Sequence, residues 1–101
     1  MFAVIFRATL NANISEQSYN DYTNTAQRLR QKALADYNCV DFTSAFEDGQ
    51  EIAISYWHRE SDILAWKQDE EHRIAQQQGA SHWYSDYQIE IVKVVRHYNK
   101  Q

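Results

Sequence analysis

The dipeptide Asp48-Gly49 constrains the fold more than any other feature of this sequence. An Asp-Gly pair favours the positive φ angles of a two-residue hairpin turn. It lies between two segments, 39–47 and 51–58, in which apolar side chains alternate with other residues as they do in β-strands. The sequence therefore predicts two antiparallel strands in the middle of the chain, joined by a tight turn.

Two more strands are predicted near the two ends of the sequence. Residues 2–9 and 87–96 are rich in β-branched and aromatic side chains. In both segments apolar residues occupy both faces, and in the second one the apolar pattern changes parity between Ile91 and Val92. Either both faces are buried there or a β-bulge lies at that point.

Helical spacing of apolar residues predicts two helical regions between these strands. The first covers 19–37, with Ser15 or Ser18 as N-cap and Asn38 as the residue that ends it. The second is expected in two pieces, 62–68 after a Ser61 cap and 70–78 before a terminating Gly79. The order strand, helix, strand, strand, helix, strand predicts an α+β, ferredoxin-like βαββαβ fold. Its four-stranded antiparallel sheet would carry the helices on one face.

Helices on one face would leave the other face of an apolar sheet uncovered. We therefore expect a homodimer, in which a second copy closes the two sheets into a dimeric α+β barrel. The alternative is an open face that is simply less polar than usual, which small domains tolerate.

Size and charge narrow the class of protein. The 101 residues predict a single domain over 1–101, and the formal net charge of -4 argues against a nucleic-acid partner. The lone Cys39 cannot form an internal disulfide, which favours a reducing, cytoplasmic location. The N-terminal segment predicts a strand and not a signal peptide. No apolar run is long enough to span a membrane, so no membrane partner is expected.

Aromatic side chains cluster in the second half of the chain, where all three tryptophans occur. Such a cluster forms either a packed corner of the core or the wall of a ligand pocket. Trp66 lies on the inward side of a predicted helix, where core packing and stacking on a flat ligand are compatible. The residues predicted to line a pocket are Tyr56, Trp66, Trp83 and Tyr84. Tyr56 and its neighbour Trp57 point to opposite faces of their strand, so only one of them can line any one cavity.

Two charged or titratable residues are catalytic candidates beside Trp66. His72 follows Asp69, Glu70 and Glu71, and a neighbouring carboxylate would raise its pKa and fix its tautomer, as suits a general base. The alternative is a solvated polar helix face. Arg7 is the one charge in an apolar strand and either pairs with an acidic residue or holds a substrate oxyanion. The histidine spacings match no metal-site signature, so no metal is expected.

The motifs Ile54-Ser55-Tyr56-Trp57, Ala65-Trp66-Lys67 and Trp83-Tyr84-x-x-Tyr87 resemble the antibiotic biosynthesis monooxygenase domain family, in particular its small stand-alone bacterial members. The resemblance implies a dimeric α+β barrel. It also implies cofactor-independent oxidation of a small aromatic or quinol-type molecule. In that scheme Trp66 stacks on the substrate, His72 or Tyr56 moves the proton, and Arg7 stabilises the anion.

Two other functions stay open beside this one. One is a non-catalytic dimeric module that binds a hydrophobic ligand or haem, and the other is haem degradation with altered ligands. The haem-degrading branch of the family has an asparagine on its first strand, a tryptophan on its second helix and a histidine further along. Trp66 matches the tryptophan, whereas Arg7 and Gln76 stand at the other two positions. The resemblance therefore implies no cofactor and does not favour haem.

Overall fold

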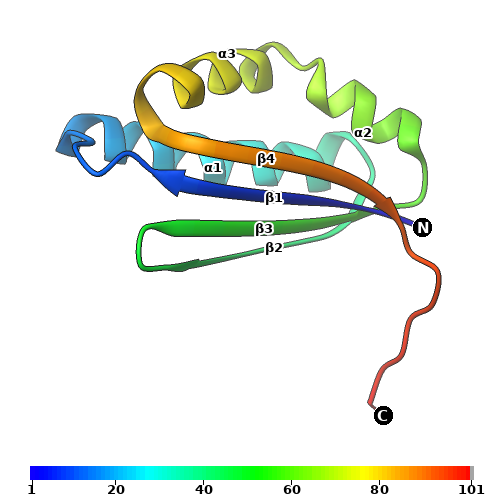
Figure 1. The fold of residues 1–101 in the computed structure, drawn as a ribbon. Helices are drawn as coiled ribbons and strands as arrows, with labels where there is room; N and C mark the ends of the chain where they lie inside the picture. Colours follow the sequence, from blue (N-terminus) through cyan, green and yellow to red (C-terminus); the bar gives the residue numbers. More distant parts are fainter. Residues whose placement is uncertain (101) are drawn as a thin grey trace.

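The computed structural model describes residues 1–100 and shows one layer of helices on one layer of sheet (Figure 1). The elements in chain order are β1 (Phe2–Leu10), α1 (Glu16–Asp36), β2 (Cys39–Glu47), β3 (Gln50–Trp57), α2 (Glu60–Lys67), α3 (Glu70–Gln78), the π-helical turn η1 (Gly79–Trp83) and β4 (Tyr84–Lys93). The predicted α+β, ferredoxin-like arrangement is confirmed, with the second helical region divided into α2, α3 and η1.

The sheet has the strand order β2-β3-β1-β4, and all neighbouring strands are antiparallel. β1 and β3 are therefore the two central strands, and β2 and β4 are the edges. The helices lie along one side of the sheet in Figure 1, and no described helix covers the other side. None of the described helices is both long and apolar enough to cross a membrane.

Local conformations confirm three of the signals in the sequence. Asp48 and Gly49 have φ angles of 52° and 78°, the left-handed values that a two-residue hairpin turn requires. Asn38 follows α1 with φ of 63°. Ser15 is the N-cap of α1, because its hydroxyl accepts a hydrogen bond of 3.1 Å from the backbone N–H of Ser18.

The predicted helix ends at Ser61 and Gly79 are wrong. α2 already begins at Glu60, after an extended Arg59, so Ser61 lies inside the first turn and caps nothing. Gly79 has φ of -59° and ψ of -48°, which continues the helix into η1 and does not end it. The glycine makes space there, because a Cβ atom would lie 2.9 Å from the ring of Tyr84 and that ring would have to shift.

The last strand begins at Tyr84, earlier than the expected start at residue 87. Its pairing with β1 is regular where the apolar pattern changes parity, with Val4 opposite Ile91 and Ala3 opposite Val92. Ile91 and Val92 therefore point to opposite faces of the sheet without a bulge. The irregularity in this pair of strands lies between Thr9 and Leu10 instead.

The core lies between the sheet and the helices in two separate groups. One contains Val4, Ala33, Cys39, Trp57, Ile63 and Trp66, and the other contains Tyr22, Ala75 and Trp83. Strand alternation places a different apolar set on the uncovered face, namely Ala3, Ile5, Ile52, Ile54, Tyr56 and Val92. The expected homodimer remains a prediction that rests on this face.

Candidate functional site

A cavity of about 500 Å³ lies between the helices and the covered face of the sheet. All four strands and all three α-helices contribute to its wall, which is largely apolar and aromatic. This volume falls within the range of cavities that hold small organic molecules. We call the two parts of its wall the Trp66 end, formed around Trp66 and His72, and the Glu51 end, formed around Glu51, Trp83 and Tyr84.

At the first end, Trp66 is both a core residue and part of the cavity wall. Its side chain is 8% exposed and packs edge-on against Phe42, with 5.8 Å between ring centroids. The ring centroids of Trp57 and His72 lie 5.4 Å and 4.2 Å away. The indole N–H donates a hydrogen bond of 3.1 Å to the carbonyl oxygen of Leu29. Trp66 is therefore a core residue that also lines the cavity, and its stacking on a ligand stays a prediction.

His72 is largely buried beside that indole, with Nδ1 3.1 Å from the carbonyl oxygen of Trp66. Since a carbonyl oxygen only accepts, Nδ1 carries the hydrogen and Nε2 keeps its lone pair. Burial lowers the pKa of His72 and outweighs the opposite effect of Asp69. The expected rise in pKa is wrong, and so is the solvated helix face. The ring is a neutral imidazole at pH 7.

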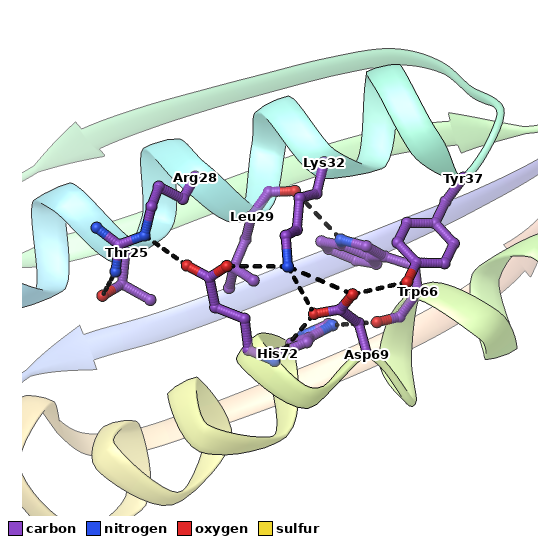
Figure 2. A network of polar contacts seen from close by, with 9 residues as sticks. Thr25, Arg28, Leu29, Lys32, Tyr37, Trp66, Asp69 and His72 are labelled. Atoms are coloured by element: carbon purple, nitrogen blue, oxygen red, sulfur yellow. Dashed lines mark hydrogen bonds and ion pairs between the residues drawn. The ribbon is translucent and has the colours of Figure 1, made fainter.

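A polar network holds the Trp66 end in place (Figure 2). Asp69 accepts hydrogen bonds of 2.6 Å from the Tyr37 hydroxyl and 3.2 Å from the Lys32 ammonium. It also caps α3 by accepting a 2.9 Å bond from the backbone N–H of Glu71, whose carboxylate lies 3.0 Å from Lys32. The Tyr37 bond leads the contacts that lower the pKa of Asp69 to about 2. The network ties α1 to the junction of α2 and α3.

The η1 turn positions two aromatic residues at the other end of the cavity. Trp83 is 5% exposed and packs edge-on against Tyr22, with 5.7 Å between centroids. Tyr84 packs edge-on against Tyr22 at 5.7 Å and against Phe6 at 5.6 Å. The structure thus brings three of the predicted pocket residues, Trp66, Trp83 and Tyr84, around one cavity. Their roles toward a ligand stay predictions.

Glu51 lines the same end, and the sequence analysis did not single it out. Its side chain belongs to the covered face of β3, between Ala8 of β1 and Phe46 of β2. It is 9% exposed, and its Oε1 atom has no hydrogen-bond partner among the described residues. Burial raises the pKa of Glu51 to about 7. The alternation of β3 indicates that Glu51 faces inward, because it shares its face with the buried Ala53 and Trp57.

Comparison with known proteins gives one clear relative in sequence. The uncharacterised protein YqjZ of Bacillus subtilis is 31% identical over 96 residues, covering 94% of this chain and 80% of YqjZ. The chain belongs to the YqjZ family. No protein-family model matches it.

Several solved structures that share the fold of this chain carry the name that the sequence motifs suggested. A putative antibiotic biosynthesis monooxygenase from Deinococcus radiodurans has a TM-score of 0.80 at 10% identity, over 100% of this chain and 99% of that one. A variant of SnoaB, a cofactor-independent oxygenase from Streptomyces nogalater, has a TM-score of 0.77 at 10% identity, over 98% and 97% of the two chains. The resemblance to antibiotic biosynthesis monooxygenases is confirmed for the ferredoxin-like fold of the single chain.

Two predicted site residues of this YqjZ relative do not reach the cavity. Arg7 lies on the uncovered face of β1 and pairs with Glu90 of β4, with 3.6 Å between Nη2 and Oε1. Tyr56 lies opposite Ala3 on that same face. Placing Tyr56 in the ligand pocket and Arg7 beside a substrate anion was therefore wrong for this cavity. The ion pair, the other possibility for Arg7, is what forms.

Binding of a metal ion or of haem would require suitable ligands among the described side chains. Within residues 1–100, no group of three or more His, Cys, Asp or Glu side chains is arranged to hold a metal ion. Gln76, which stands at the position of the haem-branch histidine, lines the cavity with an amide. An amide is not the axial ligand that haem usually takes in proteins.

Proposed function

We propose that this protein is a small monooxygenase that oxidises a planar aromatic, quinol-type molecule without a metal or an organic cofactor. The observation that carries the proposal is the aromatic-walled cavity of about 500 Å³ in a fold shared with a cofactor-independent oxygenase. Such a wall excludes water and offers flat surfaces on which an aromatic ring can stack.

His72 is the proposed proton acceptor at the Trp66 end. Its neutral ring keeps an Nε2 lone pair because Nδ1 donates to the Trp66 carbonyl. Removing a hydroxyl proton from the substrate would leave an electron-rich anion that can pass an electron to O₂. In the net reaction two substrate hydrogens are replaced by one oxygen atom and the second oxygen leaves as water, so that the substrate supplies all the electrons.

The active form is proposed to be a homodimer closed over the uncovered face of the sheet. That face carries partly exposed apolar side chains, among them Ile52 at 44% and Val92 at 37%. Burying them against a second copy would remove this surface from water. Light scattering at micromolar concentration is expected to give about twice the chain mass of 12.0 kDa. A monomer at all concentrations would contradict the dimer.

Oxygen uptake with a dihydroxynaphthalene substrate and a metal chelator present tests the activity. We expect uptake that the chelator does not change and that His72→Gln reduces by about a hundredfold, the size typical of losing a general base. His58→Gln, at an exposed histidine, serves as the matched control. Ligand binding without any oxygen uptake would favour the non-catalytic binding module instead.

A further inference from the structure

The carboxylate of Glu51 is the buried polar group that the mechanism above leaves unused. Its Oε1 atom is buried without a hydrogen-bond partner among residues 1–100, and the side chain lines the cavity. A buried polar atom normally has a partner, because leaving it without one costs free energy. An acceptor left open toward a cavity of ligand size marks a place where a ligand group can complete the bond.

The surroundings of Glu51 supply no such partner. Its strand neighbours Ala8 and Phe46 carry no polar side-chain atoms, and none of the ion pairs formed by the described residues includes it. The pKa of Tyr84 is raised mainly by burial and further by the nearby charge of the Glu51 carboxylate. The other titratable side chains lining the cavity are Tyr22, Arg30, Lys67, His72, Tyr84 and Tyr87.

The charges around the cavity favour a hydroxyl over an ammonium group as that partner. Arg30 and Lys67, both exposed, contribute two positive charges to the same wall that holds the single carboxylate. Summed over the wall, the formal charge is therefore positive, which disfavours a cationic ligand in the cavity and leaves a neutral phenol unaffected. The aromatic side chains of this end, among them Trp83 and Tyr84, suit the flat ring that carries a phenolic hydroxyl.

We propose that Glu51 is the substrate-selecting residue of this cavity and accepts a hydrogen bond from a phenolic hydroxyl of the planar ligand. This inference rests on the proposed function for the class of ligand, and it concerns binding and not oxidation. The ionised carboxylate is the stronger acceptor. Affinity for a phenol should consequently rise as the pH increases through about 7, the pKa of Glu51. Protonation of His72 is not expected in this pH range, because burial lowers its pKa below the ordinary 6.5.

Titration calorimetry of the full chain with three naphthalene probes tests the proposal without requiring turnover. At pH 8 we expect naphthol to bind about tenfold more tightly than methoxynaphthalene, which keeps the ring but cannot donate. Glu51→Leu should bind both equally, and Glu51→Gln should reduce the preference. Naphthylmethylamine, the cationic probe, should bind more weakly than naphthol.

A matched control is available on β4, the edge strand beyond β1. Glu90→Gln removes a carboxylate from the uncovered face, where it pairs with Arg7, and should keep the preference for naphthol. Equal affinity of the wild type for naphthol and its methyl ether, or an unchanged preference in Glu51→Leu, would overturn the proposal. So would tightest binding of the amine. Failure of oxygen uptake with the preference intact would reject the monooxygenase and not the Glu51 site.

Discussion

The two ends of the cavity satisfy their polar groups in different ways. At the Trp66 end the indole N–H donates to Leu29, His72 is bonded to a backbone carbonyl, and Asp69 accepts from two side chains and one backbone N–H. At the Glu51 end a carboxylate oxygen is buried with no described partner. Both ends have aromatic walls, so the difference lies in the hydrogen bonds alone.

This difference separates a region built for rigidity from one suited to recognition. The bonds at the Trp66 end hold its rings in one orientation and leave the Nε2 lone pair of His72 for a ligand. An end with an open acceptor lowers the stability of the empty protein and can regain that free energy when a donor arrives. The following substitutions test this contrast.

The largest loss of stability is expected at the Trp66 end. Trp66→Ala removes a side chain that is only 8% exposed, and it should lower the free energy of unfolding by about 3 to 5 kcal/mol. Chemical denaturation measures this change. Trp66→Phe, the matched control, should cost far less and weaken naphthol binding several-fold, because the smaller ring offers less stacking area. If Trp66→Phe binds every planar probe as the wild type does, Trp66 is a core residue only.

Removing the Glu51 carboxylate, the open acceptor, should raise the stability of the protein at pH 8. Glu51 has a folded pKa of about 7 against an ordinary 4.5, so the folded state binds more protons between these values. Wild-type stability should therefore fall as the pH rises from 4.5 to 7, by up to roughly 3 kcal/mol, and then level off. Glu51→Leu should lack this fall and be the more stable protein at pH 8. Denaturation curves at pH 5 and pH 8 measure it, and parallel profiles for the two proteins would contradict the unpaired carboxylate.

Breaking the network behind Trp66 should have a moderate effect with the reverse pH dependence. Asp69 has a folded pKa of about 2, below the ordinary 3.8, so its contribution is present above 3.8 and is lost as the pH falls toward 2. Asp69→Asn should cost about 1 to 2 kcal/mol at pH 7, typical of hydrogen bonds to a charged group. Glu70→Gln, one residue further on, is the control that should change little. An equal loss in both variants would place the effect in the general charge of α3.

The smallest effect is expected at Arg7, outside the cavity. The Arg7–Glu90 pair is about half exposed, with side chains at 50% and 54%, and such surface pairs contribute about 0 to 1 kcal/mol. Arg7→Gln should leave naphthol affinity unchanged in the same calorimetric assay. A large loss of affinity would mean that the uncovered face takes part in binding and would remove the contrast between the two ends.

The fold could be predicted because its signals are local. Asp48-Gly49 determines its own backbone angles, and Ser15 and Asn38 bound α1 through short-range bonds and a single left-handed residue. Gly79 was misread because its role depends on Tyr84, which lies against it only in the folded chain. No local pattern distinguishes a glycine needed for its φ angle from one needed for space.

The site was predicted in part for a related reason. The burial of large aromatic residues such as Trp66 and Trp83 can be predicted from residue type alone, since such side chains are mostly buried once a core forms. Arg7 and Tyr56 were placed in the cavity by analogy, although their strand parity put them on the other face. Predicting the burial of Glu51 requires both its strand parity and the position of β3 between β2 and β1. The strand order that gives this position is known only from the structure.

The number of residues in the π-helical turn at Gly79–Trp83 helps to determine the shape of the cavity wall. A π-turn holds one more residue than an α-turn, and in a helix each residue advances the chain by about 100°. Deleting one residue here would restore α-helical spacing, so that α3 and β4 could not both keep their present positions around the cavity they line. Divergence in this family can thus change what the cavity accepts through a single-codon insertion or deletion, without exchanging any residue that touches the ligand.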